Sequence, residues 1–486
     1  MVARLRRRAW VLGCVAVAAC DAPPPDTRPA NATVVPTRTA FGVGAPAEIE
    51  PQTTASAAQS LDDSRSTAIV RATARVAPAV VSVNVLRTRQ VRARSMWESM
   101  YLPPGAEQRS ASFGSGVIVS QDGIVITNDH VISGASEILV TLPGGIDVPA
   151  EVVGTDPIAD IAVLRINVPN LPVAPVGTAN GLMIGEWAIA IGNPLGNYVG
   201  DSNPTVTAGV ISAVDRNIAP SSEEEGFYFG MIQTDAAINP GNSGGALVNA
   251  NGELIGINAS IISRSGGSEG LGFAIPIDRA LQIAQDFLDY GEVRRAFLGL
   301  EIAPAEADPW GRRRGVVVSR VAEGSPAADA RIQPGDMLLA ADGRALTGPL
   351  DWEGVLLDLR EGDAIDLVVE GRSANVPVEA VAFPSATAAR VTLFQDIDLI
   401  SVTPQVQLER GLVSSDGALI TDIGRELASR IPLREGDVIV QINRARIRSA
   451  DDAARFFDSL RGEGRIVVLV ERNGSYGTTN LYWRGG

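Results

Sequence analysis

Residues 116–131 of the chain read Gly-Val-Ile-Val-Ser-Gln-Asp-Gly-Ile-Val-Ile-Thr-Asn-Asp-His-Val. Two short apolar runs, 116–120 and 124–127, flank Asp122-Gly123, a dipeptide that strongly favours a β-hairpin turn. Residues 246–249 and 253–257 flank Asn251-Gly252 in the same way. Strands and turns at this spacing recur over about two hundred residues, which predicts a mainly β fold built on an antiparallel barrel or sandwich.

The only histidine of the 486 residues, His130, follows the second of these strands. Asp160 begins the stretch Asp-Ile-Ala-Val-Leu-Arg, and Ser243 lies within Gly241-Asn-Ser-Gly-Gly245. A lone histidine usually has a structural role. Here, however, a base, an orienting carboxylate and a nucleophile occur in the order His, Asp, Ser that chymotrypsin-type sites use. We therefore predict that His130, Asp160 and Ser243 are catalytic.

The residue inventory excludes several rival chemistries. A zinc peptidase of the His-Glu-x-x-His type needs two histidines. The α/β-hydrolases place their histidine after the serine, and nothing downstream of Ser243 can serve as the base. All 41 basic residues are arginine, which excludes lysine-dependent chemistry such as a P-loop, a Schiff base or a Ser-Lys dyad. We expect a protease that is independent of ATP. We expect no cofactor and no metal.

The glycines around Ser243 have a physical reason. An oxyanion needs backbone N–H donors aimed at one point, and glycine reaches the required backbone geometry at little cost. We expect Gly241 and Ser243 to supply these donors, with Asn242 between them in the oxyanion hole.

Several stretches together resemble the HtrA/Deg family of bacterial trypsin-like proteases. They are Thr127-Asn-Asp-His-Val131, Asp160-Ile-Ala-Val-Leu164, Ala190-Ile-Gly-Asn-Pro-Leu-Gly196, Thr205-Val-Thr-Ala-Gly-Val-Ile-Ser212, Gln233-Thr-Asp-Ala-Ala-Ile-Asn-Pro-Gly-Asn-Ser-Gly-Gly245 and Gly270-Leu-Gly-Phe-Ala-Ile-Pro276. The resemblance covers about residues 68–486. It implies a trypsin-like double β-barrel of two six-stranded barrels, with the triad in the cleft between them.

The resemblance also suggests a specificity pocket. Trypsins that cleave after Arg or Lys carry an Asp six residues before the nucleophile, where this chain has Ala237. Ile238, Ile261 and Ile262 resemble the pocket walls, which implies small aliphatic residues at P1. The alternative is that these isoleucines are ordinary core residues.

The last 190 or so residues contain an internal repeat. The stretch Pro334-Gly-Asp-Met-Leu-Leu-Ala-Ala-Asp-Gly-Arg344 recurs as Glu435-Gly-Asp-Val-Ile-Val-Gln-Ile-Asn-Arg-Ala445. Each copy precedes a helical stretch (352–360, 450–461) and a strand (365–370, 465–471). Two copies about a hundred residues apart indicate two similar domains and not a solenoid.

These two domains resemble PDZ domains, which are partly open α/β barrels that add an extended peptide as a strand. Phe297-Leu298-Gly299-Leu300 resembles the loop that binds a terminal carboxylate. Arg331 stands where the family usually has Gly. In the second domain the corresponding loop is 395–397, where Asp396 should repel a carboxylate; we expect this domain to bind free C-termini poorly.

The N-terminus resembles an export signal. Arginines at positions 4 and 6–8 precede a short apolar stretch, and Val17-Ala-Ala-Cys20 resembles a bacterial lipobox. This predicts lipid attachment at Cys20, the alternative being ordinary cleavage near position 19 or 22. We expect residues 1–20 to be a signal peptide, 21–68 a Pro/Thr/Ala-rich tether, 69–292 the protease domain, 293–385 the first PDZ domain and 386–486 a divergent second one.

The expected function is degradation of misfolded or unfolded cell-envelope proteins by an acyl-enzyme mechanism. The protein should be exported to the periplasm or envelope and anchored to a membrane by lipid. Its partners should be unfolded proteins and peptide C-termini. The net charge of −15 argues against nucleic acid. The resemblance implies a homotrimer or a higher oligomer, with residues 96–101 contributing. The alternative is a lipid-anchored PDZ holdase or scaffold whose protease domain is largely dormant.

Overall fold

The computed structural model describes residues 65–90, 107–194, 203–218, 228–261, 268–394, 396–460 and 463–484. The predicted signal peptide, nearly all of the predicted tether and residues 96–101 lie outside the described residues. Within the described part of the chain, no helix is both long enough and apolar enough to cross a membrane.

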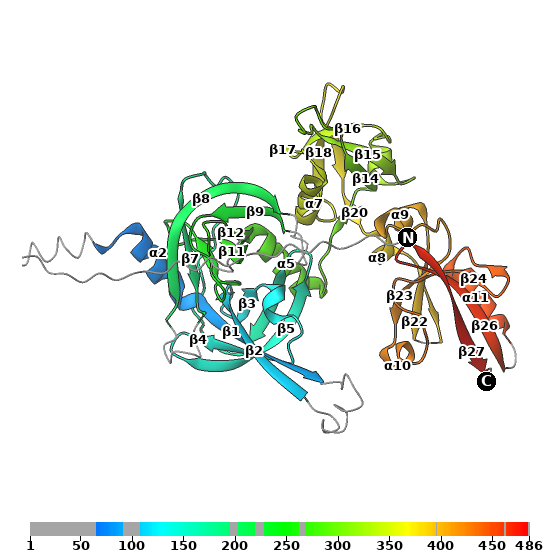
Figure 1. The fold of residues 1–486 in the computed structure, drawn as a ribbon, viewed down its shortest axis with the longest axis horizontal. Coiled ribbons are helices and arrows are strands. Elements are labelled where there is room, and N and C mark those ends of the chain that lie inside the picture. Colours follow the sequence, from blue (N-terminus) through cyan, green and yellow to red (C-terminus); the bar gives the residue numbers. More distant parts are fainter. Residues whose placement is uncertain are drawn as a thin grey trace, which may run out of the picture. The chain divides into compact units, whose positions relative to one another are not determined.

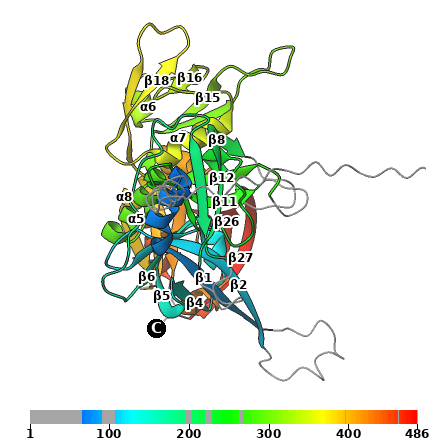
Figure 2. The same ribbon diagram turned by 90° about the vertical axis from the view of Figure 1, so that its left-hand side faces the viewer.

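The first compact element is a closed six-stranded barrel (Figures 1 and 2). Helix α2 (Ala68–Val76) precedes it and begins at Thr67, whose hydroxyl accepts the Val70 N–H. The strands pair in the order β1-β2-β3-β6-β5-β4. Their bounds are β1 (Val80–Gln90), β2 (Glu107–Ile118), β3 (Ile124–Thr127), β4 (Glu137–Leu142), β5 (Ile146–Asp156) and β6 (Ile161–Ile166).

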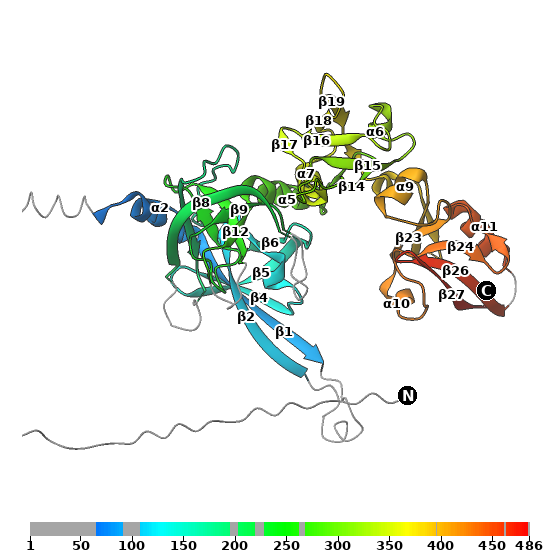
Figure 3. The same cartoon turned by 45° about the horizontal axis from the view of Figure 1, so that its top comes forward.

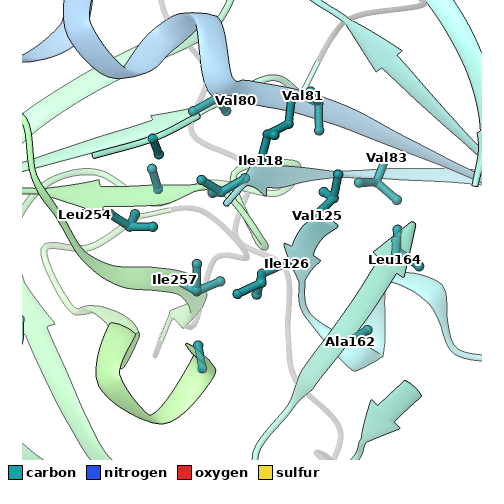
Figure 4. Close-up of a cluster of buried hydrophobic side chains, with 14 of the residues drawn as sticks. Val80, Val81, Val83, Ile118, Val125, Ile126, Ala162, Leu164, Leu254 and Ile257 are labelled. Carbon is teal, nitrogen blue, oxygen red and sulfur yellow. The ribbon is translucent and has the colours of Figure 1, made fainter. Parts of the chain in front are cut away.

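The predicted hairpin is present, since β2 and β3 pair antiparallel with Val117 opposite Ile126. All four residues of β3 are buried, and their apolar side chains join those of β1, β6 and β11 in one continuous core (Figure 4). The strand therefore has a fixed position when it ends at Thr127. A one-turn helix, α4 (Asp129–Ile132), follows at once and carries the histidine.

A second closed barrel follows, with strand order β10-β11-β12-β9-β8-β7. Its strands are β7 (Trp187–Gly192), β8 (Thr205–Ile218), β9 (Tyr228–Thr234), β10 (Ala246–Val248), β11 (Leu254–Ile261) and β12 (Gly272–Pro276). Helix α5 (Ile277–Tyr290) comes next. Its N-cap is Pro276, whose backbone is still extended at φ −52° and ψ 136°, so the helix begins only at Ile277.

The two copies of the repeat fold into two similar β domains. The first contains β13 (Ala296–Phe297), β14 (Leu300–Pro304), β15 (Val316–Val321), α6 (Pro326–Asp329), β16 (Met337–Ala341), β17 (Arg344–Ala345), α7 (Pro349–Asp358), β18 (Ala364–Val369), β19 (Val376–Glu379) and β20 (Val381–Ala382). Its main sheet has the order β14-β15-β16-β18-β19, and β13 pairs with β20.

The second copy begins after α8 (Pro384–Thr387). It contains β21 (Arg390–Leu393), β22 (Ile397–Ser401), α9 (Pro404–Glu409), β23 (Ala418–Ile423), α10 (Arg425–Ala428), β24 (Val438–Ile442), β25 (Ala445–Arg446), α11 (Ala450–Ser459), β26 (Glu463–Arg472) and β27 (Ser475–Arg484). Figure 3 shows β26 and β27 as a long hairpin at one edge of its sheet. The order here is β21-β22-β23-β24-β26-β27, so this sheet begins with one strand more than its counterpart.

Candidate active site

His130 and Asp160 are paired. The imidazole Nδ1 lies 2.8 Å from Asp160 Oδ2 and 2.9 Å from Oδ1. Because a carboxylate only accepts hydrogen bonds, Nδ1 must carry the proton, which leaves Nε2 with a free lone pair. The His130 side chain is 44% exposed and that of Asp160 only 11%, so the ring can meet a substrate while its partner is shielded from water.

The local backbone fixes this pair. The His130 N–H donates to Asp160 Oδ1 at 3.0 Å, and the buried Asn128 side chain donates to the Asp160 carbonyl at 2.9 Å. Asp160 has a positive φ of 54°, a conformation that Asp adopts more readily than most residues. Arg87, from β1, donates to the carbonyls of Val131 and Ser133 and so holds helix α4 against the barrel.

Ser243 lies in the loop between β9 and β10. Its hydroxyl donates to the Ala259 carbonyl on β11 at 2.9 Å. A serine hydroxyl has one proton, so in this arrangement that proton is not donated to His130. For His130 to accept this proton, the Ser243 hydroxyl must first release the Ala259 carbonyl.

Gly114 and Ser115 on β2 join the serine loop to the first barrel. A Cβ added at Gly114 would lie 2.7 Å from a Val131 methyl group and 3.2 Å from the Ser243 carbonyl oxygen, so the histidine helix and the serine loop meet there. Ser115 is fully buried and makes three bonds to the second barrel. Its N–H donates to the Ser243 carbonyl at 2.8 Å, its hydroxyl donates to the Gly241 carbonyl at 2.6 Å, and that hydroxyl accepts the Asn193 N–H at 2.8 Å.

The three predicted oxyanion residues have different surroundings. Gly241 has a φ of 98°, and a Cβ there would lie 2.3 Å from Pro194, so only glycine fits. The Asn242 N–H donates to the Asn239 carbonyl at 2.9 Å and is therefore unavailable to a substrate oxygen. Asn242 is instead a buried part of the loop, packed against Gly192. Gly241 and Ser243 remain the predicted donors.

Of the four predicted pocket residues, the structure describes Ala237, Ile238 and Ile261. Ala237 is half-buried, and its carbonyl accepts the Thr207 hydroxyl at 2.7 Å. Ile238 is 1% exposed and lies in the second barrel's core against Gly272, as the core alternative anticipated. Ile261 ends β11, whereas Ile262 lies outside the described residues.

Asp129 adds a second carboxyl group beside the pair. Burial raises the pKa of the Asp129 carboxyl above its ordinary value, and the negative charge of Asp160 raises it further. A hydrogen bond from the Thr155 side chain and the charge interaction with His130 lower this pKa, but burial and Asp160 outweigh them. Acid therefore neutralises Asp129 before an ordinary surface aspartate.

Sequence reasoning missed the residues that position the site. Ser115 belongs to Gly114-Ser-Gly116, where two glycines lie within strand β2, and such glycines often mark a close approach of another backbone. That signal was available for Ser115. Arg87 has no local signal, because its partners on α4 are more than forty residues away in the chain.

The loop Phe297–Leu300 of the first C-terminal domain presents backbone donors. The Leu298 carbonyl accepts the Ala327 N–H at 2.9 Å, and the Gly299 carbonyl accepts the Ala322 N–H at 2.8 Å. In a trans peptide unit the C=O and N–H point in opposite directions, so the N–H groups of Gly299 and Leu300 face away from those partners. Gly299 has a φ of 81°, and a Cβ there would collide with Ser325 at 2.0 Å.

A pocket lies beside this loop. Its lining includes Phe297, Leu300 and Ile302 from the loop and β14, with Trp352 and Leu356 from α7. Glu353 also lines it, and burial raises the pKa of the Glu353 carboxyl above its ordinary value. An apolar groove that ends at two outward N–H groups can hold an extended peptide with a terminal carboxylate.

Comparisons with known proteins match the protease region and the first C-terminal domain to known families. Residues 114–257 match the family model of the trypsin-like peptidase domain, and residues 296–379 match that of the PDZ domain. A probable periplasmic serine endoprotease, DegP-like, from Pseudomonas savastanoi pv. phaseolicola is 36% identical over 394 residues, which are 76% of this chain and 80% of that protein.

A second DegP-like relative and one solved structure extend this similarity. The probable periplasmic serine endoprotease of Chlamydia trachomatis serovar D is 35% identical over 375 residues, covering 75% of this chain and 73% of that protein. Among solved structures, a serine-to-alanine form of the HtrA-type protease AlgW with a decapeptide is 36% identical, with a TM-score of 0.50. That likeness covers 66% of this chain and 99% of the other.

Proposed function

Because the chain belongs to the HtrA/Deg family of trypsin-like serine endopeptidases with PDZ domains, we propose that His130, Asp160 and Ser243 are its charge-relay residues. The observation that carries this proposal is the imidazole Nδ1 within hydrogen-bond distance of both Asp160 oxygens. The backbone of Ser243 supports it, because its carbonyl lies beside Gly114, which also contacts Val131 next to His130.

The proposed reaction follows from these positions. Ser243 Oγ attacks the scissile carbonyl while His130 Nε2 takes its proton, and Asp160 stabilises the imidazolium that forms. The N–H groups of Gly241 and Ser243 bind the oxyanion. His130 then gives its proton to the leaving amine, and an acyl-enzyme remains on Ser243. Water, activated by His130, hydrolyses that ester and restores the serine.

The substrate proposal is unfolded or misfolded proteins of the cell envelope, hydrolysed without ATP. The relatives are named periplasmic, which supports export of this chain as well. Export supports in turn the assignment of residues 1–20 as a signal peptide. Lipid attachment at Cys20 and a trimer are further parts of the proposal; intact mass of the mature protein and light scattering test them.

Ser243→Ala tests the site assignment. It should abolish casein cleavage, since loss of a triad nucleophile removes about a millionfold of rate, leaving the contribution of binding and the oxyanion hole. Ser136→Ala, which removes an exposed hydroxyl bonded to the Leu86 carbonyl, is the matched control and should keep full activity. Casein cleavage by purified Ser243→Ala near the wild-type rate would refute the assignment.

The scaffold alternative is favoured by one observation, the Ser243 hydroxyl bonded to the Ala259 carbonyl. A fluorophosphonate probe separates the two functions. Labelling at Ser243 with casein or a peptide present supports the protease, because the hydroxyl must then reach His130 to be activated. If Ser243 stays unlabelled under every such condition, the chain acts as a scaffold.

A further inference from the structure

The two C-terminal domains differ at one sheet edge. In the first domain, β14 begins the main sheet and pairs with β15 alone among the described strands. Helix α7 packs beside it. An unpaired strand next to a helix is where a PDZ domain adds a peptide as a further strand.

Strand β22 is the counterpart of β14. Leu300 at the start of β14 faces Val321, and Ile397 at the start of β22 faces Ile423. In both pairs the register shifts after the second residue of the strand. The carbonyl just before each strand, Gly299 or Asp396, accepts an N–H from beyond the paired strand at 2.8 Å. The two sheets can therefore be superposed residue by residue at this edge.

In the second domain that edge is occupied by β21. Arg390–Leu393 pairs antiparallel with β22, which is the direction a bound peptide would take. Leu393 lies opposite Ile397, at the start of β22, where the last residue of a ligand would lie. Helix α11 packs on β21 as well as on β22.

The side chains of β21 alternate as those of a ligand strand would. Leu393 is 5% exposed and Val391 is half-buried, and both pack in the core with Phe457 of α11. Thr392 between them is exposed and bonds Asp398 at 2.7 Å. The Phe394 ring, just beyond β21, meets Phe457 of α11 edge to face, with 5.3 Å between the ring centroids.

A backbone hydrogen bond also makes β21 similar to a bound peptide. The Asp396 N–H donates to the Leu393 carbonyl at 3.1 Å. Asp396 is the counterpart of Gly299, whose N–H faces outward in the first domain. The Leu393 carbonyl oxygen thus takes the place of a terminal carboxylate oxygen, and a short turn connects it covalently to β22.

We propose that β21 is a built-in ligand of the second PDZ domain, so that each chain binds one extended peptide, in the first domain. The part that concerns the first domain rests on the peptide recognition proposed above. The repulsion by Asp396 expected from sequence gives the same outcome for a different reason: the groove is already filled.

Hydrogen exchange on the full-length Ser243→Ala protein tests this proposal, with a peptide of residues 384–393 as the probe. Its free C-terminus ends in Arg-Val-Thr-Leu. Without peptide, amides of β22 should exchange at least about tenfold more slowly than those of β14. The peptide should protect β14 and leave β22 unchanged. Fast exchange in β22 that slows when peptide is added would overturn the proposal.

The two proposals can fail separately in this experiment. If β22 is protected without peptide but β14 never responds, the recognition function of the first domain is wrong and the built-in ligand stands. If β14 responds and β22 responds equally, the built-in ligand is wrong.

Val391→Pro is the variant that should release β21. In an antiparallel pair the residues that bond across the ladder alternate, so Val391, opposite Leu399, has its N–H directed to β22, as Leu393 does. Proline removes that N–H and distorts the strand. We expect exchange in β22 to rise at least about tenfold and the added peptide to restore its protection. Thr478→Pro, on the outer strand β27, is the control and should leave β22 unchanged. Unaltered β22 exchange in Val391→Pro would contradict the proposal. If Val391→Pro also exposes β24 and β26, Val391→Gly replaces it with the same expected result.

Discussion

At the scale of single residues, Ser115 has more influence on the site than its chemistry suggests. It touches no substrate, yet its backbone and hydroxyl bond the carbonyls on both sides of Asn242. Those bonds set the direction of the loop that carries the nucleophile, so Ser115 is a positioning residue.

Ser115→Ala should lower kcat about 10–100-fold with little change in KM, because misplaced oxyanion donors weaken transition-state binding selectively. It should also destabilise the protein by about 1–3 kcal/mol, since the Gly241 carbonyl and the Asn193 N–H lose a buried partner. Steady-state kinetics on a peptide substrate and thermal unfolding measure the two effects. Ser136→Ala is the control, and an unchanged kcat in Ser115→Ala would show that the loop does not depend on this hydroxyl.

Cleavage specificity also belongs to this scale. With Ala237 in place of an acid, we expect cuts after Val, Ala, Ile or Leu and very few after Arg or Lys. Mass spectrometry of digested casein checks this directly. Ala237→Asp provides the contrast, because a carboxylate there should raise the share of cuts after basic residues. A wild-type digest dominated by cuts after Arg or Lys would disprove the pocket prediction.

From sequence alone, the order of His130, Asp160 and Ser243 and the lack of a second histidine predicted a catalytic set, and the structure pairs the first two. It could not predict the role of Ser115 or Arg87, whose partners become neighbours only when the chain folds. Ile238 shows a different limit of sequence-based prediction, because its residue type fits two roles. An isoleucine near a serine loop looks the same in sequence whether it lines a pocket or fills a core.

At the scale of elements, local signals located α11 and β18 to within two residues. Strand β2, by contrast, begins at Glu107, nine residues before the predicted run at 116. Helix α7 begins at Pro349, earlier than expected, since proline fits the first turn and the Asp351 carboxylate accepts the Gly348 N–H there at 3.0 Å. Arg331 keeps the turn that the family makes with glycine, at a φ of 59°. Strand β21 had no such signal, because pairing with β22 is a property of the sheet.

The loop Phe297–Leu300 leads to a prediction at this scale. Full-length Ser243→Ala should bind a peptide with an apolar residue and a free C-terminal carboxylate about tenfold more tightly than its amide, because a charged acceptor strengthens bonds from backbone N–H groups. Fluorescence anisotropy with matched acid and amide peptides measures the ratio. Ile302→Glu, on β14, should remove binding of both. Equal affinity for acid and amide would show that the loop does not read the carboxylate.

At the scale of the whole molecule, ion pairs connect the second barrel to the first PDZ domain. Arg279 on α5 is 3% exposed and bonds Asp358 at the end of α7 at 2.6 Å, and Arg344 bonds the same carboxylate at 2.7 Å. Burial alone would raise the pKa of Asp358, but the two guanidinium groups lower it below its ordinary value.

Asp358→Asn should weaken this contact by about 2 kcal/mol, since it leaves a buried arginine without its carboxylate. Faster hydrogen exchange in α5 and α7 reports the loss. Asp308→Asn, which breaks an exposed pair with Arg312, is the control and should have little effect. No change in either helix would show that the pair does not hold the two parts together.

The Asp358 carboxylate also makes the stability of the contact between α5 and α7 depend on pH. Because the folded-state pKa of Asp358 is lowered, its contribution is complete above the ordinary aspartate value of 3.8 and is lost as pH falls through the folded value. Wild type should therefore lose protection in α5 and α7 in that acidic range. Asp358→Asn should be insensitive to pH there, and parallel curves for the two proteins would exclude this linkage.

Because β21 is covalently connected to β22, a free peptide competes poorly with it for the groove of the second domain. A ligand strand joined covalently to its groove by only three residues, 394–396, has an effective concentration of about millimolar or more, whatever the protein concentration. A dilute free peptide cannot displace it by mass action. Only a segment that is itself held nearby, for example by a substrate already bound to another part of the same assembly, gains a comparable local concentration. The second domain would then respond to a segment that is tethered close to it, and hardly to the bulk concentration of a free peptide.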